Sequence, residues 1–330
     1  MSKLKYRTME ELINADIPRP IPLLGSWLTT EQINMVYAPS GVGKSMFALS
    51  LGLAVAGGGE FLGWKCDEPH KVLIVDGEMG VFDLQERVKL LSSTISGIDL
   101  TSANQNLSFL AFQDQSTSTD WPVLSNDEDH EVILDRIRKE GIKLVIFDNL
   151  STLAQVDNEN DASSWNDTLH LMRMISRTGC AVLMVHHTRK GNTKGDASFR
   201  GSQVLSVLLS CSIRLLPVEG AGTSFTLEFD KFRNKKSRET DTRNVTLSEA
   251  GWEYEIPQLG KVYEVIEAIR SREYASQKEV SEGLKWSTGE VSKVLRKAYE
   301  QGLFTSEEKQ KCFEEAKDVR EDNQAFFDDF

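Results

Sequence analysis

Short, nearly continuous apolar runs alternate with longer amphipathic segments between Gln32 and His187. Apolar runs of this length predict strands that are buried on both faces, and apolar residues three or four positions apart predict helices. Strands separated by helices are typical of a mostly parallel sheet with helices on both faces, so the pattern predicts an α/β fold. The expected strands are residues 33–37, 71–78, 107–112, 143–148 and 180–187, and the expected helices are 46–56, 81–91, 128–140 and 162–177.

The pattern changes after His187. A basic loop that contains glycines (188–199) precedes a helix of small residues (201–209). Antiparallel strands are then expected, and they close a domain that spans residues 21–257. These strands are residues 211–216, 223–233, 242–247 and 252–256.

A different pattern follows an expected linker at residues 257–260. Helix, helix-turn-helix and wing predict a small winged-helix domain over residues 258–310. The expected elements are a helix over 261–272, two helices opened by the capping boxes 276–279 and 287–290, and a wing strand that starts at 302–305.

The last expected helix of this domain carries basic and acidic residues. Lys293, Arg296 and Lys297 are opposed by Glu290 and Glu300. Modules of this kind either bind DNA or serve packing and partner docking, and the sequence leaves both open.

Both ends of the chain have a composition of their own. Residues 1–20 are an expected N-terminal arm with a short helix at 9–13, which is either frayed or packs on a neighbouring subunit. Residues 311–330 form an acidic tail that ends in three phenylalanines among aspartates. Its charge favours disorder, whereas its exposed aromatic residues favour a docking peptide for a replication partner.

Composition restricts the class of protein. The chain has 330 residues, of which 40% are hydrophobic and 27% charged, as in ordinary globular proteins. No apolar run approaches the ~20 residues of a membrane span, and no secretory signal is recognisable. The four cysteines lack metal-ligand spacing, and Cys180 and Cys211 are expected to be buried thiols in a cytoplasmic protein. A net charge of −12 restricts nucleic-acid binding to local basic patches.

The strongest local motif is Ala38-Pro-Ser-Gly-Val-Gly-Lys-Ser45, which lies between an expected strand and an expected helix. This context predicts a phosphate-binding P-loop, whose backbone N–H groups and helix N-terminus surround the phosphates of a nucleoside triphosphate. Ala38 stands where the motif usually has glycine. The expected ATP-binding residues are Ala38, Pro39, Ser40, Gly41, Val42, Gly43, Lys44, Ser45 and Met46.

Polar residues gather at the expected carboxyl ends of the strands. Lys44, Glu78, Asp148, His186 and His187 all fall at this edge, where ligands of parallel sheets bind. Strand alternation would point Asp76 and Glu78 in the same direction, so periodicity alone does not choose between them.

With these residues in place, the chain resembles the RecA-like hexameric helicases, most of all the plasmid RepA type and more distantly the DnaB family. The resemblance covers roughly residues 20–256. It rests on the P-loop, Asp76-Gly-Glu78, Asp148 at the end of a Walker B strand, the His186-His187 pair and the segment Phe199-Arg-Gly-Ser-Gln-Val-Leu205.

The resemblance implies ATP and Mg²⁺ as cofactors. Lys44 would contact the β- and γ-phosphates, and Ser45 and Asp148 would hold Mg²⁺. Glu78 would orient or deprotonate the attacking water. His187 or His186 would sense the γ-phosphate.

The same resemblance implies a site completed by a neighbouring subunit. An arginine finger acting in trans is expected among Arg214, Arg233, Lys231 and Arg200. The acidic loop 156–161 is a poor DNA contact, so the 188–199 loop is the expected one. Its Arg189, Lys190 and Lys194 would contact phosphates of single-stranded DNA.

The expected function is that of an ATP-dependent, ring-forming DNA helicase or translocase of a plasmid, phage or mobile element, with a hexamer as the favoured assembly. The alternative is a nucleotide-switched ATPase that loads or regulates replication or recombination partners without unwinding. A RecA-like recombination ATPase is a weaker third interpretation, because the 201–209 segment is more helicase-like.

Overall fold

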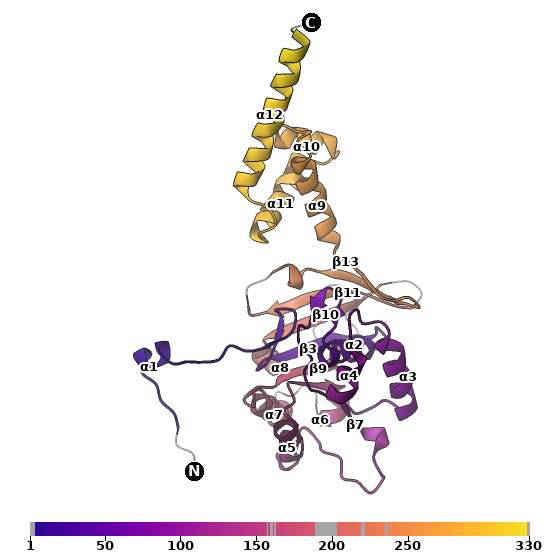
Figure 1. Ribbon diagram of the computed structural model, residues 1–330. Helices are drawn as coiled ribbons and strands as arrows, with labels where there is room; N and C mark the ends of the chain where they lie inside the picture. The colour runs from indigo at the N-terminus through magenta and orange to yellow at the C-terminus, as the bar shows by residue number, and fades with distance from the viewer. Residues whose placement is uncertain are drawn as a thin grey trace.

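The computed structural model of the chain describes residues 4–156, 158, 161, 163–188, 203–218, 222–234 and 237–328. Within these residues, the centre of the molecule is a nine-stranded sheet (Figure 1). In spatial order its strands are β13 (Gly251–Glu255), β12 (Arg243–Ser248), β11 (Thr223–Phe232), β10 (Cys211–Pro217), β3 (Ile33–Ala38), β9 (Ala181–His187), β8 (Leu144–Asp148), β6 (Val72–Asp76) and β7 (Leu107–Ala111).

The sheet is parallel on one side and antiparallel on the other. Each adjacent pair from β10 to β7 is parallel. Each adjacent pair from β10 to β13 is antiparallel and joined in sequence order. This arrangement confirms the predicted α/β fold with a mostly parallel central sheet. Two small hairpins lie outside the sheet, β1 (Pro22–Leu24) with β2 (Leu28–Thr29) and β4 (Glu60–Phe61) with β5 (Trp64–Lys65).

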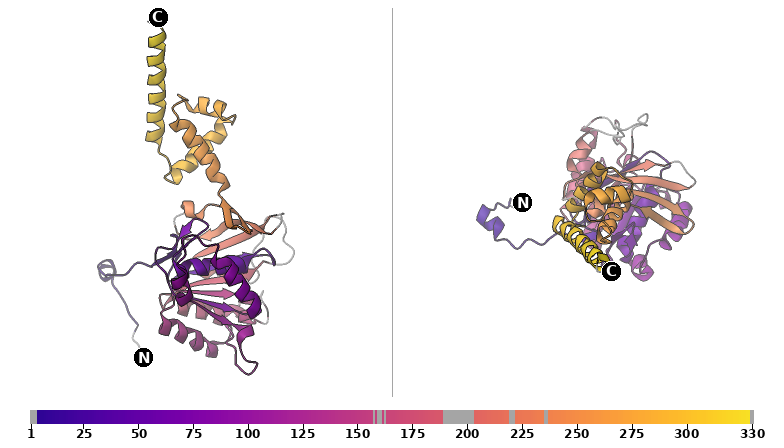
Figure 2. Two further views of the ribbon diagram at one scale, coloured as in Figure 1. Left: turned by 45° about the vertical axis from the view of Figure 1, so that its right-hand side comes forward. Right: turned by 90° about the horizontal axis from the view of Figure 1, so that it is seen from above.

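Helices cover both faces of the parallel half (Figures 1 and 2). One face packs on α2 and the neighbouring α3 and α4, and the other packs on α5, α6 and α7. The helices of the described residues are α1 (Met9–Ile13), α2 (Lys44–Gly57), α3 (Val81–Ser92), α4 (Leu100–Asn106), α5 (His130–Glu140), α6 (Leu150–Ala154), α7 (Asn166–Ser176), α8 (Gln203–Leu208), α9 (Pro257–Arg270), α10 (Gln277–Gly283), α11 (Thr288–Glu300) and α12 (Ser306–Asp328).

Alternation along β3 divides the core into two layers. Val36 and Ala38 contribute to the cluster on the α2 face, whereas Met35 and Tyr37 contribute to the cluster on the α5–α7 face. Because all residues of β3 are buried, the strand has no polar face, as expected for the centre of a covered sheet. The P-loop therefore starts from a fully buried strand of the sheet.

The N-terminal arm projects away from the body of the molecule (Figures 1 and 2). Its short helix α1 has the predicted bounds and is closed by a capping box between Thr8 and Glu11. None of the residues of α1 is buried.

The C-terminal helices α9 to α12 enclose a hydrophobic core of their own. Two expectations for this region are wrong. The expected linker at 257–260 is the first turn of α9. Pro257 is tolerated there because a backbone N–H at the start of a helix has no acceptor within the helix. The expected wing strand is absent from the described residues, because the chain turns at Gly302 and enters α12 at Ser306.

A capping box explains the missing wing. Glu308 N–H donates to Thr305 Oγ1 at 3.0 Å, and Thr305 N–H donates to Glu308 Oε2 at 2.9 Å. Cys312 and Phe313 of α12 pack against the helical core, which includes Phe304, so α12 is attached by apolar contacts as well. The backbone stays helical to Asp328, which replaces the expected flexible tail over most of its length. The domain boundaries themselves remain predictions.

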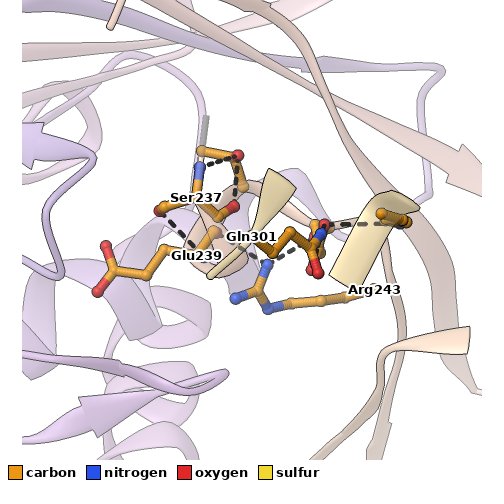
Figure 3. Close-up of polar contacts among 7 residues, drawn as sticks. Ser237, Glu239, Arg243 and Gln301 are labelled. Atoms are coloured by element: carbon orange, nitrogen blue, oxygen red, sulfur yellow. Dashed lines mark hydrogen bonds and ion pairs between the residues drawn. The ribbon is translucent and has the colours of Figure 1, made fainter. Parts of the chain in front are cut away.

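The helical region contacts the sheet at the loop around η4 (Arg238–Thr240) (Figure 3). Gln301, just after α11, donates through Nε2 to both carboxylate oxygens of Asp241, at 2.9 and 3.2 Å. Lys297 lies 3.8 Å from the same carboxylate. Arg238 stacks on Tyr263 of α9 at 5.2 Å from the ring centre.

In the part of the chain that the structure describes, we find no helix both long and apolar enough to span a membrane. Cys66, Cys180 and Cys211 are buried free thiols, as the sequence predicts for the last two.

Candidate nucleotide-binding site

The P-loop joins β3 to α2 with the predicted geometry. Gly41 and Gly43 have φ angles of 81° and 107°, which side-chain-bearing residues rarely adopt. A Cβ atom on Gly43 would also lie 2.4 Å from Thr223 Cγ2. Glycine is therefore required at position 43 by both conformation and space.

A cavity of about 680 Å³ opens beside this loop. Its size lies within the usual range for small-molecule sites, about 300–1,000 Å³. Of the predicted ATP-binding residues, Ala38, Pro39 and Val42 do not line it. The ones that do are Ser40, Gly41, Gly43, Lys44, Ser45 and Met46.

Lys44 is buried at the first position of α2. Its Nζ donates to the carbonyl oxygens of Ala38 at 3.1 Å and Pro39 at 2.9 Å. Burial lowers the pKa of Lys44 to about 8, although Asp148 and Glu78 act in the opposite direction. A bound polyphosphate would stabilise the charged form of this amine.

Asp148 ends β8 next to Asp76 at the end of β6, and the two residues are paired in register. Both carboxylates are buried. The pKa of Asp148 is raised to about 6, mainly by burial and in part by the neighbouring Asp76, although a hydrogen bond to Ser45 acts in the opposite direction. Buried acids in this position are suited to a divalent cation, which compensates their charge.

Glu78 lies beyond the end of β6, in a turn that Asp76 organises. Asp76 Oδ1 accepts hydrogen bonds from the backbone N–H groups of Glu78 at 3.0 Å and Met79 at 2.6 Å. Glu78 Oε2 accepts a hydrogen bond of 2.5 Å from Asn149 Nδ2. Asp76 and Glu78 thus have different surroundings, and the exposed Glu78 lines the cavity in a held orientation.

Asn149 is a functional candidate that sequence reasoning missed. It is buried, and its Oδ1 accepts from Thr152 N–H at 3.1 Å as the N-cap of α6. Its Nδ2 donates the hydrogen bond to Glu78 described above. The signal was present in the sequence, because asparagine directly after an expected strand and before a helical segment is a capping residue.

The two histidines lie on different faces of the sheet. His187 lines the cavity, and its Nδ1 is 3.2 Å from Lys44 Nζ and 3.3 Å from Ser40 Oγ. His186 is fully buried on the other face, with its ring 5.8 Å from that of Trp165. The structure therefore brings His187 to the cavity and does not bring His186 there.

The cavity, the P-loop and the acidic strand ends are those of a nucleotide-binding domain. The AAA_25 family, described as an AAA domain, matches residues 2–193, which is more than half of the chain. The chain belongs to this family.

Two solved structures are similar to this AAA protein. One is a KaiC-like protein from the hyperthermophilic archaeon Pyrococcus horikoshii OT3, with 15% identity, coverage of 72% of this chain and 98% of that chain, and a TM-score of 0.49. The other is the RadB recombinase, with 16% identity, coverage of 68% and 91%, and a TM-score of 0.48.

The cavity of the AAA domain also contains a cation that sequence reasoning missed. Arg87 of α3 lines it and has no ion-pair partner among the described residues. It lies nine positions after Glu78 and one turn after Asp83, which also lines the cavity. A guanidinium without an ion-pair partner beside a P-loop can donate hydrogen bonds to a phosphate group or to the attacking water.

The residues at the cavity fit a magnesium–nucleotide complex. Ser45 and Asp148, which share a hydrogen bond, supply the hydroxyl and carboxylate oxygens that Mg²⁺ prefers. Among the described residues, no group of three or more His, Cys, Asp or Glu side chains is arranged to hold a metal ion by itself.

The candidate finger residues lie after the segment that the family matches, and those that are described do not line the cavity. Arg214 on β10 forms an ion pair of 2.7 Å with Glu228 on β11. Lys231 donates to Ser206 O, and Arg233 donates to the carbonyl oxygens of Leu209 and Val207. Arg200, Arg189, Lys190 and Lys194 lie outside the described residues.

Proposed function

We propose that this AAA protein is an ATP hydrolase that forms a ring and moves along or unwinds DNA. One observation carries the proposal: the adjacent Lys44 and Ser45 meet Glu78, Asp148 and His187, which come from three other segments of the chain, at one cavity beside the P-loop. These are a phosphate-binding amine, two cation ligands, a carboxylate for the water and a polar sensor.

The chain's own residues divide the work of hydrolysis. The P-loop backbone and Lys44 bind the phosphates, and Mg²⁺ would neutralise charge on the phosphate oxygens when bound by Ser45 and Asp148. Glu78 orients the attacking water and accepts its proton, while Asn149 keeps the carboxylate in place. His187 contacts both Ser40 and Lys44, so it is placed to respond to the γ-phosphate.

A second copy of the chain completes this site. In the part of the chain that is described, Arg87 is the arginine that lines the cavity, and it lies on the same subunit as the P-loop. Arg214 and Arg233 are the favoured candidates for a finger in trans, with Lys231 and Arg200 as further candidates. Such a residue contributes ~10³-fold or more to turnover in comparable enzymes. Ring assembly, with a hexamer favoured, therefore forms part of the proposal.

Single-stranded DNA is the proposed polymer. Arg189, Lys190 and Lys194 belong to the loop that follows His187, so a change at the γ-phosphate sensor would be transmitted directly to the DNA contacts. Contacts to phosphates carry little sequence information, which suits a motor that moves along a strand.

Strand separation tests the motor. The protein is expected to unwind a forked duplex with ATP and Mg²⁺, and Lys44→Ala is expected to abolish both ATP binding and unwinding. Unwinding that persists in Lys44→Ala would contradict the proposal. Nucleotide-dependent assembly without any strand separation would instead support the switch that loads or regulates partners.

A further inference from the structure

Helices α10 and α11 form a helix-turn-helix whose second helix has one free face. Gly283 ends α10, and a Cβ atom there would lie 2.3 Å from Tyr274 Oη, so the close turn requires glycine. Gln277 Nε2 donates to Ser292 Oγ at 2.7 Å and fixes the first helix against the second. Val291, Leu295 and Ala298 of α11 face the core.

Free cations gather on the opposite side of α11 and in the turn before it. Lys285, Lys293 and Arg296 are exposed, and none of them has an ion-pair partner among the residues that are described. By contrast, Arg270 at the end of α9 and Arg272 just after it are paired with Glu308 and Glu315 of α12.

The acidic residues of the same elements are engaged elsewhere. Glu290 accepts hydrogen bonds from the Ser287 backbone N–H at 3.0 Å and hydroxyl at 2.8 Å, so its carboxylate is turned back to cap α11. Glu282 lies 3.8 Å from Lys278. Glu300 lines the cavity between α11 and the sheet. The free face of α11 therefore carries positive charge in a chain whose net charge is −12.

The C-terminal end of α11 contacts the loop around η4. Lys297 and Gln301 both contact the carboxylate of Asp241, which lies in the loop around η4 (Figure 3). The sequence pattern places Lys297 with Lys293 and Arg296, but the structure separates it from them. Lys297 is thus docked, whereas Lys293 and Arg296 leave a free basic face on the same helix.

We propose that the free basic face of the α10–α11 helix-turn-helix binds the phosphate backbone of duplex DNA, through Lys285, Lys293 and Arg296. In a helix-turn-helix the second helix lies in the major groove. Lys285 lies in the turn before α11, and Lys293 and Arg296 lie along the exposed side of the helix, where they can reach the phosphates on the rim of the groove. This duplex site is separate from the single-strand contacts proposed for the 188–199 loop, and it does not depend on them.

Binding of a labelled, blunt-ended duplex to the full-length protein, followed by fluorescence anisotropy at several salt concentrations, tests the site. The variant K293Q/R296Q is expected to bind the duplex about ten-fold more weakly. Because each lost phosphate contact removes about 0.9 from the slope of log affinity against log salt, its slope should fall by about 2. The matched control K311Q/K317Q removes two exposed cations from α12 and should bind like the parent.

Hydrolysis of ATP stimulated by a single-stranded oligonucleotide separates this site from the proposed motor. K293Q/R296Q should retain this stimulation, and its circular dichroism and thermal unfolding should match the parent. Unchanged duplex affinity and slope in K293Q/R296Q would overturn the proposal and leave this face to a protein partner. Equal losses in K293Q/R296Q and K311Q/K317Q would overturn it too, because they would show only a general effect of charge.

Discussion

Lys44 is a buried amine whose charged form is disfavoured by its burial. Since burial lowers its pKa to about 8, it is increasingly neutral above pH 8, whereas nucleotide phosphates favour the protonated form. ATP affinity should therefore fall as pH rises above 8, and binding near pH 8 should take up protons. Calorimetry in buffers with different ionisation enthalpies measures this uptake. A heat of binding that does not depend on the buffer at pH 8 would contradict the assignment.

The two histidines allow a matched comparison. His187→Ala should lower kcat strongly, because it removes the contacts with Lys44 and Ser40. His186→Ala should leave the pocket intact and instead lower the free energy of unfolding by about 1–3 kcal/mol, because its ring is buried against Trp165. Steady-state kinetics and urea unfolding of both variants measure the two effects. Equal kinetic losses without loss of stability would show that both histidines act in catalysis.

At this scale, residue types could be predicted from the sequence better than their orientation. The P-loop and the acidic strand ends are local patterns, and they lie where they are expected. Which of His186 and His187 faces the pocket depends on which face α2 covers, and this is a property of the whole sheet. Arg87 escaped prediction because it lies on a helix, away from the strand ends that the α/β pattern marks.

At the scale of elements, buried Arg243 connects β12 to the loop around η4 (Figure 3). It donates to the carbonyl oxygens of Leu62, Glu239 and Asp241 and lies 4.4 Å from the Trp64 ring centre. Arg243→Met should lower the free energy of unfolding by about 3 kcal/mol, because it leaves buried carbonyl groups without donors. Urea unfolding measures the loss. A change below about 0.5 kcal/mol, the usual range for surface positions, would contradict this account.

The finger in trans is also a prediction about elements, since β10 would meet a neighbouring pocket. Arg214→Ala and Lys44→Ala should each be inactive alone, with turnover in Arg214→Ala reduced about 10³-fold. A mixture should recover activity, because Arg214→Ala subunits supply an intact P-loop and Lys44→Ala subunits supply Arg214. Absence of recovery with Arg214→Ala, together with recovery in the same experiment with Arg233→Ala, would transfer the role to Arg233.

Elements with a clear apolar pattern were predictable, and those without one were not. The strands of the parallel half lie within a residue or two of their predicted bounds. The two-residue strands of the small hairpins carry no periodic signal, and α4 is short and polar. The wing was a wrong prediction because Thr305 and Glu308 form a capping box, a local signal that outweighs the strand-like Leu303 and Phe304.

At the scale of the whole molecule, the sheet places the nucleotide site at one edge, and the C-terminal helices contact the antiparallel strands at the far side of the same sheet. The acidic net charge of the chain limits where the proposed DNA contacts can lie. In a chain with net charge −12, the proposed DNA contacts are restricted to local clusters of cations, in the 188–199 loop and on α11. Sequence alone could propose both clusters but could not distinguish the free Lys293 from the docked Lys297.

The central claim is that ATP hydrolysis in this protein is coupled to DNA. The most direct measurement is the rate of ATP hydrolysis by the purified protein with and without a single-stranded oligonucleotide, alongside Glu78→Gln. The account predicts strong stimulation by the oligonucleotide and loss of hydrolysis in Glu78→Gln with ATP binding retained. Hydrolysis that does not respond to DNA, or that persists in Glu78→Gln, would contradict it.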